Sequence, residues 1–440
     1  MICPIDYRYG REEMKRIFEE NSRLEYMLRV EGALSLVHAE FGNIPPEMAE
    51  KINEMATREH VRLERVKEIE REIKHDVMAL VKALSEVSGE AGKYVHLGAT
   101  SNDIIDTANA LQIKDGLEII LKGLGELRQV LLALAKEHRD TVMIGRTHGQ
   151  HALPITFGLK MAVFATEIAR HEERIRQGMP RFCVGKLLGA VGTGAALGKD
   201  ALRIQEKLME KLGIWAENGC TQVVGRDRYI ELICLLANIA TTCEKFATEI
   251  RNLQRTEINE ASEYFEETQV GSSTMPHKRN PVMAENICGL ARVVRALVLP
   301  AFENNLMWHE RDLTNSSAER FIIPHGFVLC DDIIHKTISL FRKLIVNAEQ
   351  MRKNIEFTQG LVMAERVMIE LTRKGMGRQE AHELLRKLSM EARAEKRHLR
   401  DLLVERQILS REEAGKIFEA ASYVGVAPEI VDKIVRELGD

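Results

Sequence analysis

Proline is rare in this chain, and its positions leave long stretches uninterrupted. The 440 residues contain 10 prolines, and the spans 47–153, 181–275 and 325–427 contain none. Proline removes a backbone donor and breaks the interior of a helix, so a span without it can hold a very long helix. The spacing therefore favours a chain built from helices much longer than average.

Apolar residues within these spans recur with the period of a helix. Between Asp106 and Arg139 they follow an i, i+3, i+4 spacing with charged residues between them. Similar stripes cover 157–176, 228–258, 283–299 and 327–355, whereas the alternation typical of strands is nearly absent. We therefore expect an all-α fold. Helices of this length pack lengthwise against one another, which predicts a central bundle of roughly antiparallel helices.

Shorter elements flank the predicted bundle on both sides. We expect three helical domains: an N-terminal domain over 1–105, the long-helix bundle and oligomer core over 106–352, and a C-terminal domain over 353–440. Some stripes carry more apolar surface than one packing seam needs, as in the run 297–299. Such breadth predicts burial between subunits, so we expect an oligomer.

The overall composition excludes several classes of function. The chain has 62 Lys and Arg against 66 Asp and Glu, a balance that does not suit a protein coating nucleic acid or an anionic membrane. The 7 cysteines are scattered without a CxxC pair, which fits a reducing cytosol. Neither a signal peptide nor an apolar run of membrane-spanning length is present, so we expect a cytoplasmic protein without nucleic acid or membrane partners. No HExxH or EF-hand pattern occurs, and we expect neither metal nor cofactor.

One loop concentrates polar and basic side chains in a way that helix packing does not require. Residues 271–281 read GSSTMPHKRNP, and the two prolines in this stretch prevent a continuous helix. Two adjacent serines and three basic residues have no packing role here. The segment is typical of a loop that meets anions.

Three further clusters have both a chemical and a purely structural interpretation. GRTHGQHA at 145–152 places His148 and His151 beside glycines at a helix entrance, where a histidine could exchange protons near neutral pH or only cap a turn. KYVHLGATSND at 93–103 could bind a carboxylate or cap the following helix. WHERDLTNSSAER at 308–320 could bind a phosphate or form a solvated helix start.

A glycine-rich run at 185–198, GKLLGAVGTGAALG, lacks the context of a nucleotide-binding loop. It contains no GxxxxGK[ST] pattern, and no strand-helix-strand unit surrounds it. We expect a close-packed or mobile connection between long helices.

The ordered set of motifs resembles a known superfamily over most of the chain. GATS at 98–101, RTH at 146–148 and GSSTMPHKRNP at 271–281 follow the order and rough separation of the three signature regions of the fumarase/aspartase superfamily. Within it, the HKRNP ending, WHERD with SSAER, KHDV, TQ with a following RD, and the N-terminal Arg-Tyr are similar to the adenylosuccinate lyases. The resemblance implies a homotetramer whose core is a helix bundle from all four chains, with active sites where three subunits meet.

The resemblance also implies a reaction and a set of site residues. Adenylosuccinate lyases release fumarate by beta-elimination, converting adenylosuccinate to AMP and SAICAR to AICAR in purine nucleotide biosynthesis. Ser272 is implied as the general base and His148 as the general acid. A lone serine is a poor base, so the loop must surround it with positive charge before it acts. The implied substrate-binding residues are Arg8, Tyr9, His75, Asp76, His96, Thr100, Ser101, Gln222, Ser273, Lys278, Arg279, Asn280, Asn286, Arg311, Ser316 and Arg320.

Two alternatives stay open at the level of sequence. A sister lyase of the same superfamily would act on another substrate, and one that takes free amino acids would have no use for the phosphate-binding arginines Arg8, Arg311 and Arg320. A helical scaffold without activity would share the fold, although it would not need Ser272 and His148. Turnover measurements discriminate among the three.

Overall fold

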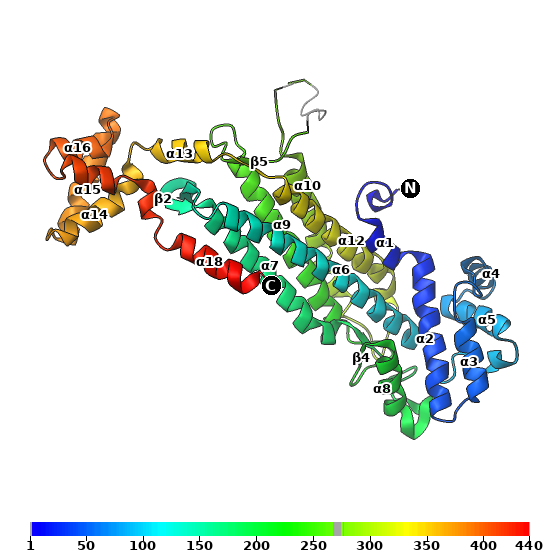
Figure 1. Cartoon of the computed structure of the whole chain (residues 1–440). Coiled ribbons are helices and arrows are strands. Elements are labelled where there is room, and N and C mark those ends of the chain that lie inside the picture. Colours follow the sequence, from blue (N-terminus) through cyan, green and yellow to red (C-terminus); the bar gives the residue numbers. More distant parts are fainter. Residues whose placement is uncertain (1, 267–273, 276, 440) are drawn as a thin grey trace. The chain divides into compact units, whose positions relative to one another are not determined.

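The computed structural model describes residues 2–266, 274–275 and 277–439, and most of these are helical (Figure 1). The expected all-α fold is confirmed, with only two-stranded sheets in the described part of the chain. Contacts divide the chain into two compact units. The first comprises Met1–Gly123, His171–Cys243 and Gly289–His335, and the second comprises Leu124–Arg170, Glu244–Cys288 and Lys336–Asp440. The expected division into three domains at 105 and 352 stays a prediction.

Five helices contribute residues to both units. They are α6 (Ser101–Glu137), α7 (Phe157–Phe182), α9 (Asp227–Leu253), α10 (Val282–Ala296) and α12 (Thr314–Arg342). Four of the five predicted stripes correspond to α6, α7, α9 and α10 within a few residues. The fifth, predicted over 327–355, is wrong in its second half, because α12 ends at Arg342 and a short strand and a new helix follow.

Most of the remaining elements of the first unit are short. They are η1 (Pro4–Asp6), α1 (Glu12–Phe18), α2 (Glu20–Glu40), α3 (Pro46–Met55), α4 (Leu63–Ile73), α5 (Asp76–Ser88), η2 (Gly89–Tyr94), β3 (Val184–Gly185), η3 (Ala195–Asp200), α8 (Ala201–Leu212), β4 (Trp215–Ala216) and α11 (Val298–Glu303). Helices α2 to α5 share a core that includes Leu28, Ile52 and Leu80. β3 and β4 pair in parallel.

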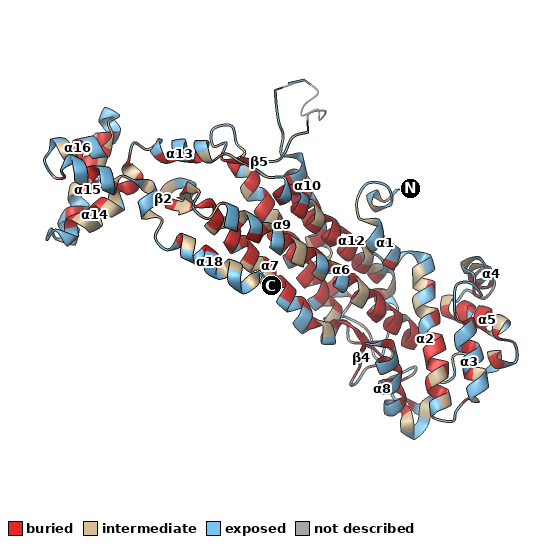
Figure 2. Ribbon diagram, in the orientation of Figure 1, coloured by how far each residue is buried: buried red, intermediate tan, exposed pale blue. Residues whose placement is uncertain are grey.

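The second unit adds two sheets and a group of C-terminal helices. Its elements are β1 (Val142–Thr147), β2 (Gln150–Thr156), β5 (Ala261–Ser262), β6 (Ile345–Val346), α13 (Ala348–Glu356), η4 (Leu361–Met363), α14 (Ala364–Arg373), α15 (Arg378–Glu395), α16 (Leu399–Glu405), α17 (Arg411–Ile417), η5 (Ala420–Tyr423) and α18 (Ala427–Leu438). β5 pairs antiparallel with β6. In this unit the long helices pack through aromatic rings, since Phe164 of α7 stacks on Phe246 of α9 with centroids 4.0 Å apart and Phe341 of α12 meets both edge-on. Buried residues line the long helices in Figure 2.

The segment that carries His148 differs from the expectation. It is a β-hairpin rather than a helix entrance, with β1 and β2 paired antiparallel and Thr147 opposite Gln150. His148 and Gly149 form its two-residue turn, and both have positive φ, 52° and 73°. Such a turn matches the twist of the flanking strands, which explains why the chain reverses here. Helix α7 begins only at Phe157.

The glycine-rich run at 185–198, expected to be a close-packed or mobile connection, is close-packed in its first part, because residues 185–188 are buried, whereas most of residues 189–198 are partly or fully exposed. Lys186 is fully buried and pairs with the buried carboxylate of Asp103 in α6. The same carboxylate accepts hydrogen bonds from the backbone N–H groups of Leu188 and Gly189, both at 3.1 Å, and of Thr100 at 2.8 Å. Asp103 therefore fixes the GATS segment and the glycine-rich connection against each other.

A buried arginine joins three helices of the first unit. Arg226, immediately before α9, donates to both carboxylate oxygens of Asp106 in α6 at 2.9 and 3.0 Å and to both of Glu319 in α12 at 2.8 and 3.1 Å. Its remaining N–H bonds the carbonyl of Val224 at 3.0 Å, so all five donors are used. Burial alone would lower the pKa of Arg226, but the carboxylates, with Asp106 foremost, raise it well above its ordinary value.

We expect the substitution Arg226→Met to lower the free energy of unfolding by about 3–5 kcal/mol, because it leaves two buried carboxylates without a partner. Thermal or urea unfolding at fixed protein concentration measures the change. Lys51→Ala is the matched control, since Lys51 pairs with Glu54 on the surface, and such pairs contribute under about 1 kcal/mol. Equal effects of the two substitutions would contradict the role assigned to Arg226.

Candidate active site

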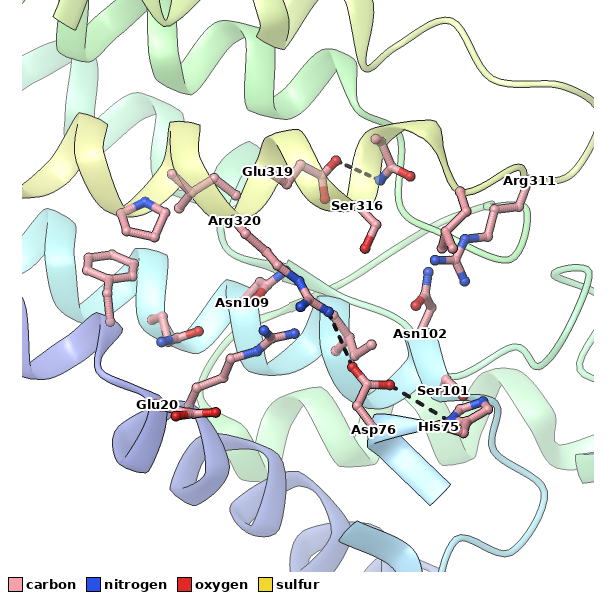
Figure 3. A pocket seen from close by; sticks show the side chains of 18 of the residues that line it. Glu20, His75, Asp76, Ser101, Asn102, Asn109, Arg311, Ser316, Glu319 and Arg320 are labelled. Carbon is pink, nitrogen blue, oxygen red and sulfur yellow. Dashed lines mark hydrogen bonds and ion pairs between the residues drawn. The ribbon is translucent and has the colours of Figure 1, made fainter. Parts of the chain in front are cut away.

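The first unit contains a cavity of about 520 Å³. Cationic, acidic, polar and apolar residues all face it, and Figure 3 shows ten of them labelled. The cations are Arg23, Lys74, Arg226, Arg311 and Arg320; the acids are Glu20, Glu70, Asp76 and Glu319; the uncharged polar residues are His75, Ser101, Asn102, Asn109, Gln112, Asn315 and Ser316; the apolar ones are Phe18, Ile105, Leu313, Ile323 and Pro324.

The N-terminal ends of three helices contribute to this cavity. His75 and Asp76 begin α5, Ser101 begins α6, and Ser316 lies in the first turn of α12. The free N–H groups and the dipole of a helix make its N-terminus favourable for negative charge. His75 accepts a hydrogen bond at Nδ1 from the N–H of Met78 at 3.3 Å, which places the proton of the neutral ring on Nε2. The backbone thus favours an anionic ligand here.

Two of the arginines predicted to bind the phosphate, Arg311 and Arg320, line the cavity and have polar partners. Arg311 donates to Oε1 of Gln222 at 2.7 Å, and Gln222 in turn donates to the carbonyl of Ala190 at 3.1 Å. Arg320 lies 3.4 Å from a carboxylate oxygen of Asp76. The Nε of Arg311 is buried without a hydrogen-bond partner in the described structure. Both guanidiniums therefore have a polar partner and retain donors for a ligand.

The structure brings many of the predicted site residues together. His75, Asp76, Ser101, Arg311, Ser316 and Arg320 line the cavity, and Gln222 joins them through Arg311. The other members in this unit, Arg8, Tyr9, His96 and Thr100, do not line it. Arg8 lies over the ring of Tyr9, with its guanidinium carbon 5.9 Å from the ring centroid.

The remaining predicted residues belong to the second unit or lie outside the described part. His148, Lys278, Arg279, Asn280 and Asn286 are in the second unit. His148 is exposed at the hairpin turn, and Lys278 and Arg279 are exposed. Ser272 and Ser273 lie outside the described residues. The juxtaposition of Ser272 with His148 thus stays a prediction.

The hairpin that presents His148 is anchored by a buried carboxylate. Arg146 of β1 donates to both oxygens of Glu260, at 2.8 and 2.7 Å, and the amide of Asn354 donates to Glu260 at 2.7 Å. Glu260 is completely buried. Sequence analysis missed Glu260 and Asn354, since neither belongs to a recognisable motif. Their bonds restrain the backbone two residues before His148.

The start of α10, which follows the GSSTMPHKRNP loop, is also held by a carboxylate. Glu263 accepts hydrogen bonds from the N–H groups of Met283 at 3.1 Å and Ala284 at 2.5 Å. Burial raises the pKa of Glu263, and these two hydrogen bonds oppose the rise. Gln254 donates to the carbonyl of Arg279 at 3.0 Å. The end of the loop is therefore tied to the second unit at two points.

Comparison with known proteins identifies the family. Residues 6–296 match a family model described as Lyase, and residues 360–434 match one described as Adenylosuccinate lyase C-terminus. Proteins named adenylosuccinate lyase are 54% identical in Pyrococcus abyssi, over 99% of this chain and 97% of the relative, and 51% identical in Methanocaldococcus jannaschii, over 99% and 96%. The chain belongs to the adenylosuccinate lyase family.

Solved structures with the same fold belong to proteins that carry other names. A fumarate lyase from Mesorhizobium sp. BNC1 superposes with a TM-score of 0.89 at 33% identity, over 98% of each chain. A 3-carboxy-cis,cis-muconate lactonizing enzyme from Pseudomonas putida gives 0.89 at 35% identity, over 99% of this chain and 98% of the other. The fold is thus shared by different chemistries, so the place of this chain among adenylosuccinate lyases rests on the sequence relatives.

Two features of the described residues bear on metal and membrane partners. They contain no cluster of three or more His, Cys, Asp or Glu side chains arranged to hold a metal ion. None of the helices in this part combines the length and apolar character needed to cross a lipid bilayer.

His96 pairs with a buried carboxylate beside the GATS segment. Its Nδ1 lies 2.6 Å from Oε1 of Glu31, which is almost fully buried. Burial lowers the pKa of His96, but Glu31 raises it by more, so the net pKa lies above its ordinary value. A histidine with a raised pKa in the folded state stabilises the fold below its unfolded pKa, and that stabilisation is lost as the pH rises through the folded value.

We therefore expect the unfolding free energy of the wild type to fall more steeply than that of the Glu31→Gln variant as the pH rises from about 6 to about 9. Glutamine keeps the shape of the side chain but removes the charge that holds the proton on His96. Urea titrations of both proteins at a series of pH values measure the difference in unfolding free energy. The contributions of the other histidines are the same in both proteins and cancel in this difference. Parallel stability curves would show that the pair does not bind a proton on folding.

Proposed function

We propose that this chain is an adenylosuccinate lyase that releases fumarate by beta-elimination, from adenylosuccinate to give AMP and from SAICAR to give AICAR. The observation that carries the proposal is the 54% identity over 99% of the chain to a protein of that name. The cavity supports it independently, because arginines and helix N-termini suit the phosphate that both substrates carry.

The phosphate end of the substrate is assigned to the first unit. Arg311, Ser316 and Arg320 line the cavity there, and Arg8 and Tyr9 are assigned to the same end. His75, Asp76 and Gln222 are assigned to the ribose, base or leaving amine. The carboxylates and neighbouring groups are assigned to Thr100, Ser101, Ser273, Lys278, Asn280 and Asn286, with His96 and Arg279 as further substrate-binding residues.

The chemistry needs a base, a stabilised carbanion and an acid. Ser272 is proposed to remove the proton from the carbon beside a carboxylate of the succinyl group, giving a carbanion whose charge Lys278 and N–H donors stabilise. The C–N bond then breaks, and His148 donates a proton to the leaving nitrogen. The hairpin is compatible with this role for His148, because Arg146 and Glu260 restrain the backbone that leads into its turn.

A homotetramer with shared active sites is part of the proposal. Large apolar side chains are exposed on α10 and α11, where Val293, Leu299 and Phe302 are 46%, 67% and 51% accessible. Such surfaces are typical of interfaces, and further copies of the chain are the proposed partners. We also assign the protein to the cytoplasm, which the scattered cysteines support.

Turnover of adenylosuccinate is the direct test. Purified protein should release fumarate and AMP in equal amounts, followed by absorbance and by chromatography of the nucleotide. Inactivity on adenylosuccinate together with cleavage of argininosuccinate or aspartate would instead assign the chain to a sister lyase. Inactivity on every one of these substrates would favour a scaffold.

We expect Ser272→Ala and His148→Gln each to lower kcat by a factor on the order of 10² to 10⁴, because each removes one partner of the proton transfers. Steady-state kinetics measure the loss, and light scattering checks that the oligomer is unchanged. A near-normal rate in either variant would require a different base or acid.

Mixing the two inactive variants tests whether sites are shared. If Ser272 and His148 of one site come from different chains, mixed tetramers contain some sites with both wild-type residues, and part of the activity should return. Subunit exchange is verified by tagging one variant and recovering the mixed species. A verified mixed tetramer without any recovered activity would place both residues of a site in one chain.

A further inference from the structure

Arg23 lies near the start of α2 and lines the cavity, yet no sequence motif includes it. Its guanidinium is partly buried and makes no hydrogen bond or ion pair with any side chain or backbone group of the described structure. The other arginines around the cavity differ in this respect. Arg226 uses every donor, Arg311 bonds Gln222, and Arg320 pairs with Asp76. The donors of Arg23 therefore face the cavity without a protein acceptor, and a bound anion would supply one.

The charges near Arg23 leave room for an anion. Burial lowers the pKa of Arg23, the positive charge of Arg320 lowers it next, and the carboxylates of Asp76, Glu20 and Glu70 oppose this only in part. Two of these carboxylates are engaged elsewhere, since Asp76 pairs with Arg320 and Glu20 pairs with Lys67. The positive charges of Arg23 and Arg320 thus repel each other beside one cavity. A dianion bound between them would offset this repulsion.

We propose that Arg23 is a phosphate-binding residue, which together with Arg320 holds the phosphate monoester of the nucleotide substrate in this cavity. The planar fork of a guanidinium can donate two parallel hydrogen bonds to phosphate oxygens, which a point charge such as lysine cannot match. The inference rests on the proposed function, because it takes the ligand to be a nucleotide. It adds a residue of α2 to the phosphate end, which is otherwise assigned to Arg8, Tyr9, Arg311, Ser316 and Arg320.

A thermodynamic cycle that combines one substitution with one change of ligand tests whether Arg23 contacts the phosphate. Binding of AMP and of adenosine is measured by calorimetry or by competition for the wild type and for Arg23→Gln. Loss of a charged hydrogen-bond donor should weaken AMP binding by about 10- to 100-fold, while the affinity for adenosine stays unchanged because adenosine lacks the phosphate. The interaction between the two changes isolates the contact of Arg23 with the phosphate.

Two further variants sharpen the result. Arg29→Gln removes a positive charge from an exposed position on the same helix and should change neither affinity. Arg23→Lys keeps the charge without the fork and should lie between the wild type and Arg23→Gln. In turnover, Arg23→Gln should raise KM with little change in kcat, because the phosphate is bound equally in the ground and transition states.

The outcomes separate the two proposals. A wild type that neither binds AMP nor cleaves adenylosuccinate would overturn the proposed function itself. If the wild type does both, equal weakening of AMP and adenosine by Arg23→Gln would show that Arg23 only supports the fold, and unchanged AMP binding would show that it does not contact the phosphate. Either of these two results overturns the inference and leaves the proposed function standing.

Discussion

The buried guanidinium of Arg226 is the interaction on which the geometry of the cavity depends. Asp106 and Glu319 lie on α6 and α12, and Arg226 itself precedes α9, so one side chain fixes the mutual position of three helices. Two of those helices begin at the cavity and supply Ser101 and Ser316. A hydrophobic seam would tolerate sliding, whereas a guanidinium with two bidentate partners permits one register only. The cost of burying these charges is offset because every donor is used.

The cavity brings cationic and acidic side chains together, and the pairing among them decides which charges are left for a ligand. The chain as a whole carries a net charge of -4, and five cationic and four acidic side chains face the cavity. Glu319 is neutralised by Arg226, and Asp76 is shared with Arg320. The cationic side chains on the cavity wall without a carboxylate partner in the described structure are Arg23, Lys74 and Arg311, and the helix N-termini add partial positive charge. The proposed phosphate of the substrate would therefore meet a local excess of donors.

Sequence reasoning was most successful where the physical signal is local and repeated. Proline spacing and apolar periodicity located α6, α7, α9 and α10, because each rests on many residues. The hairpin was missed, since its turn is only His148 and Gly149 and a histidine with positive φ is not a common turn signal. The break after Arg342 was missed because the apolar spacing continues through it. Arg23 and Glu260 were invisible for another reason: charged residues among charged neighbours look like a solvated surface until the fold shows which of them are buried.

The two units differ in how firmly they hold their site residues, and the difference matches the chemistry proposed for each. In the first unit, Ser101 and Ser316 stand on helix ends that Arg226 fixes, so these proposed binding groups are positioned before any ligand arrives. In the second, His148 sits on an exposed turn whose base alone is fixed by Glu260, and Lys278 and Arg279 are exposed. Binding a remote phosphate on a rigid surface supplies energy that can be used to close less restrained groups around the reacting bond. The proposed mechanism fits this separation, because a serine base that needs enclosure would become reactive only after the correct nucleotide has been bound.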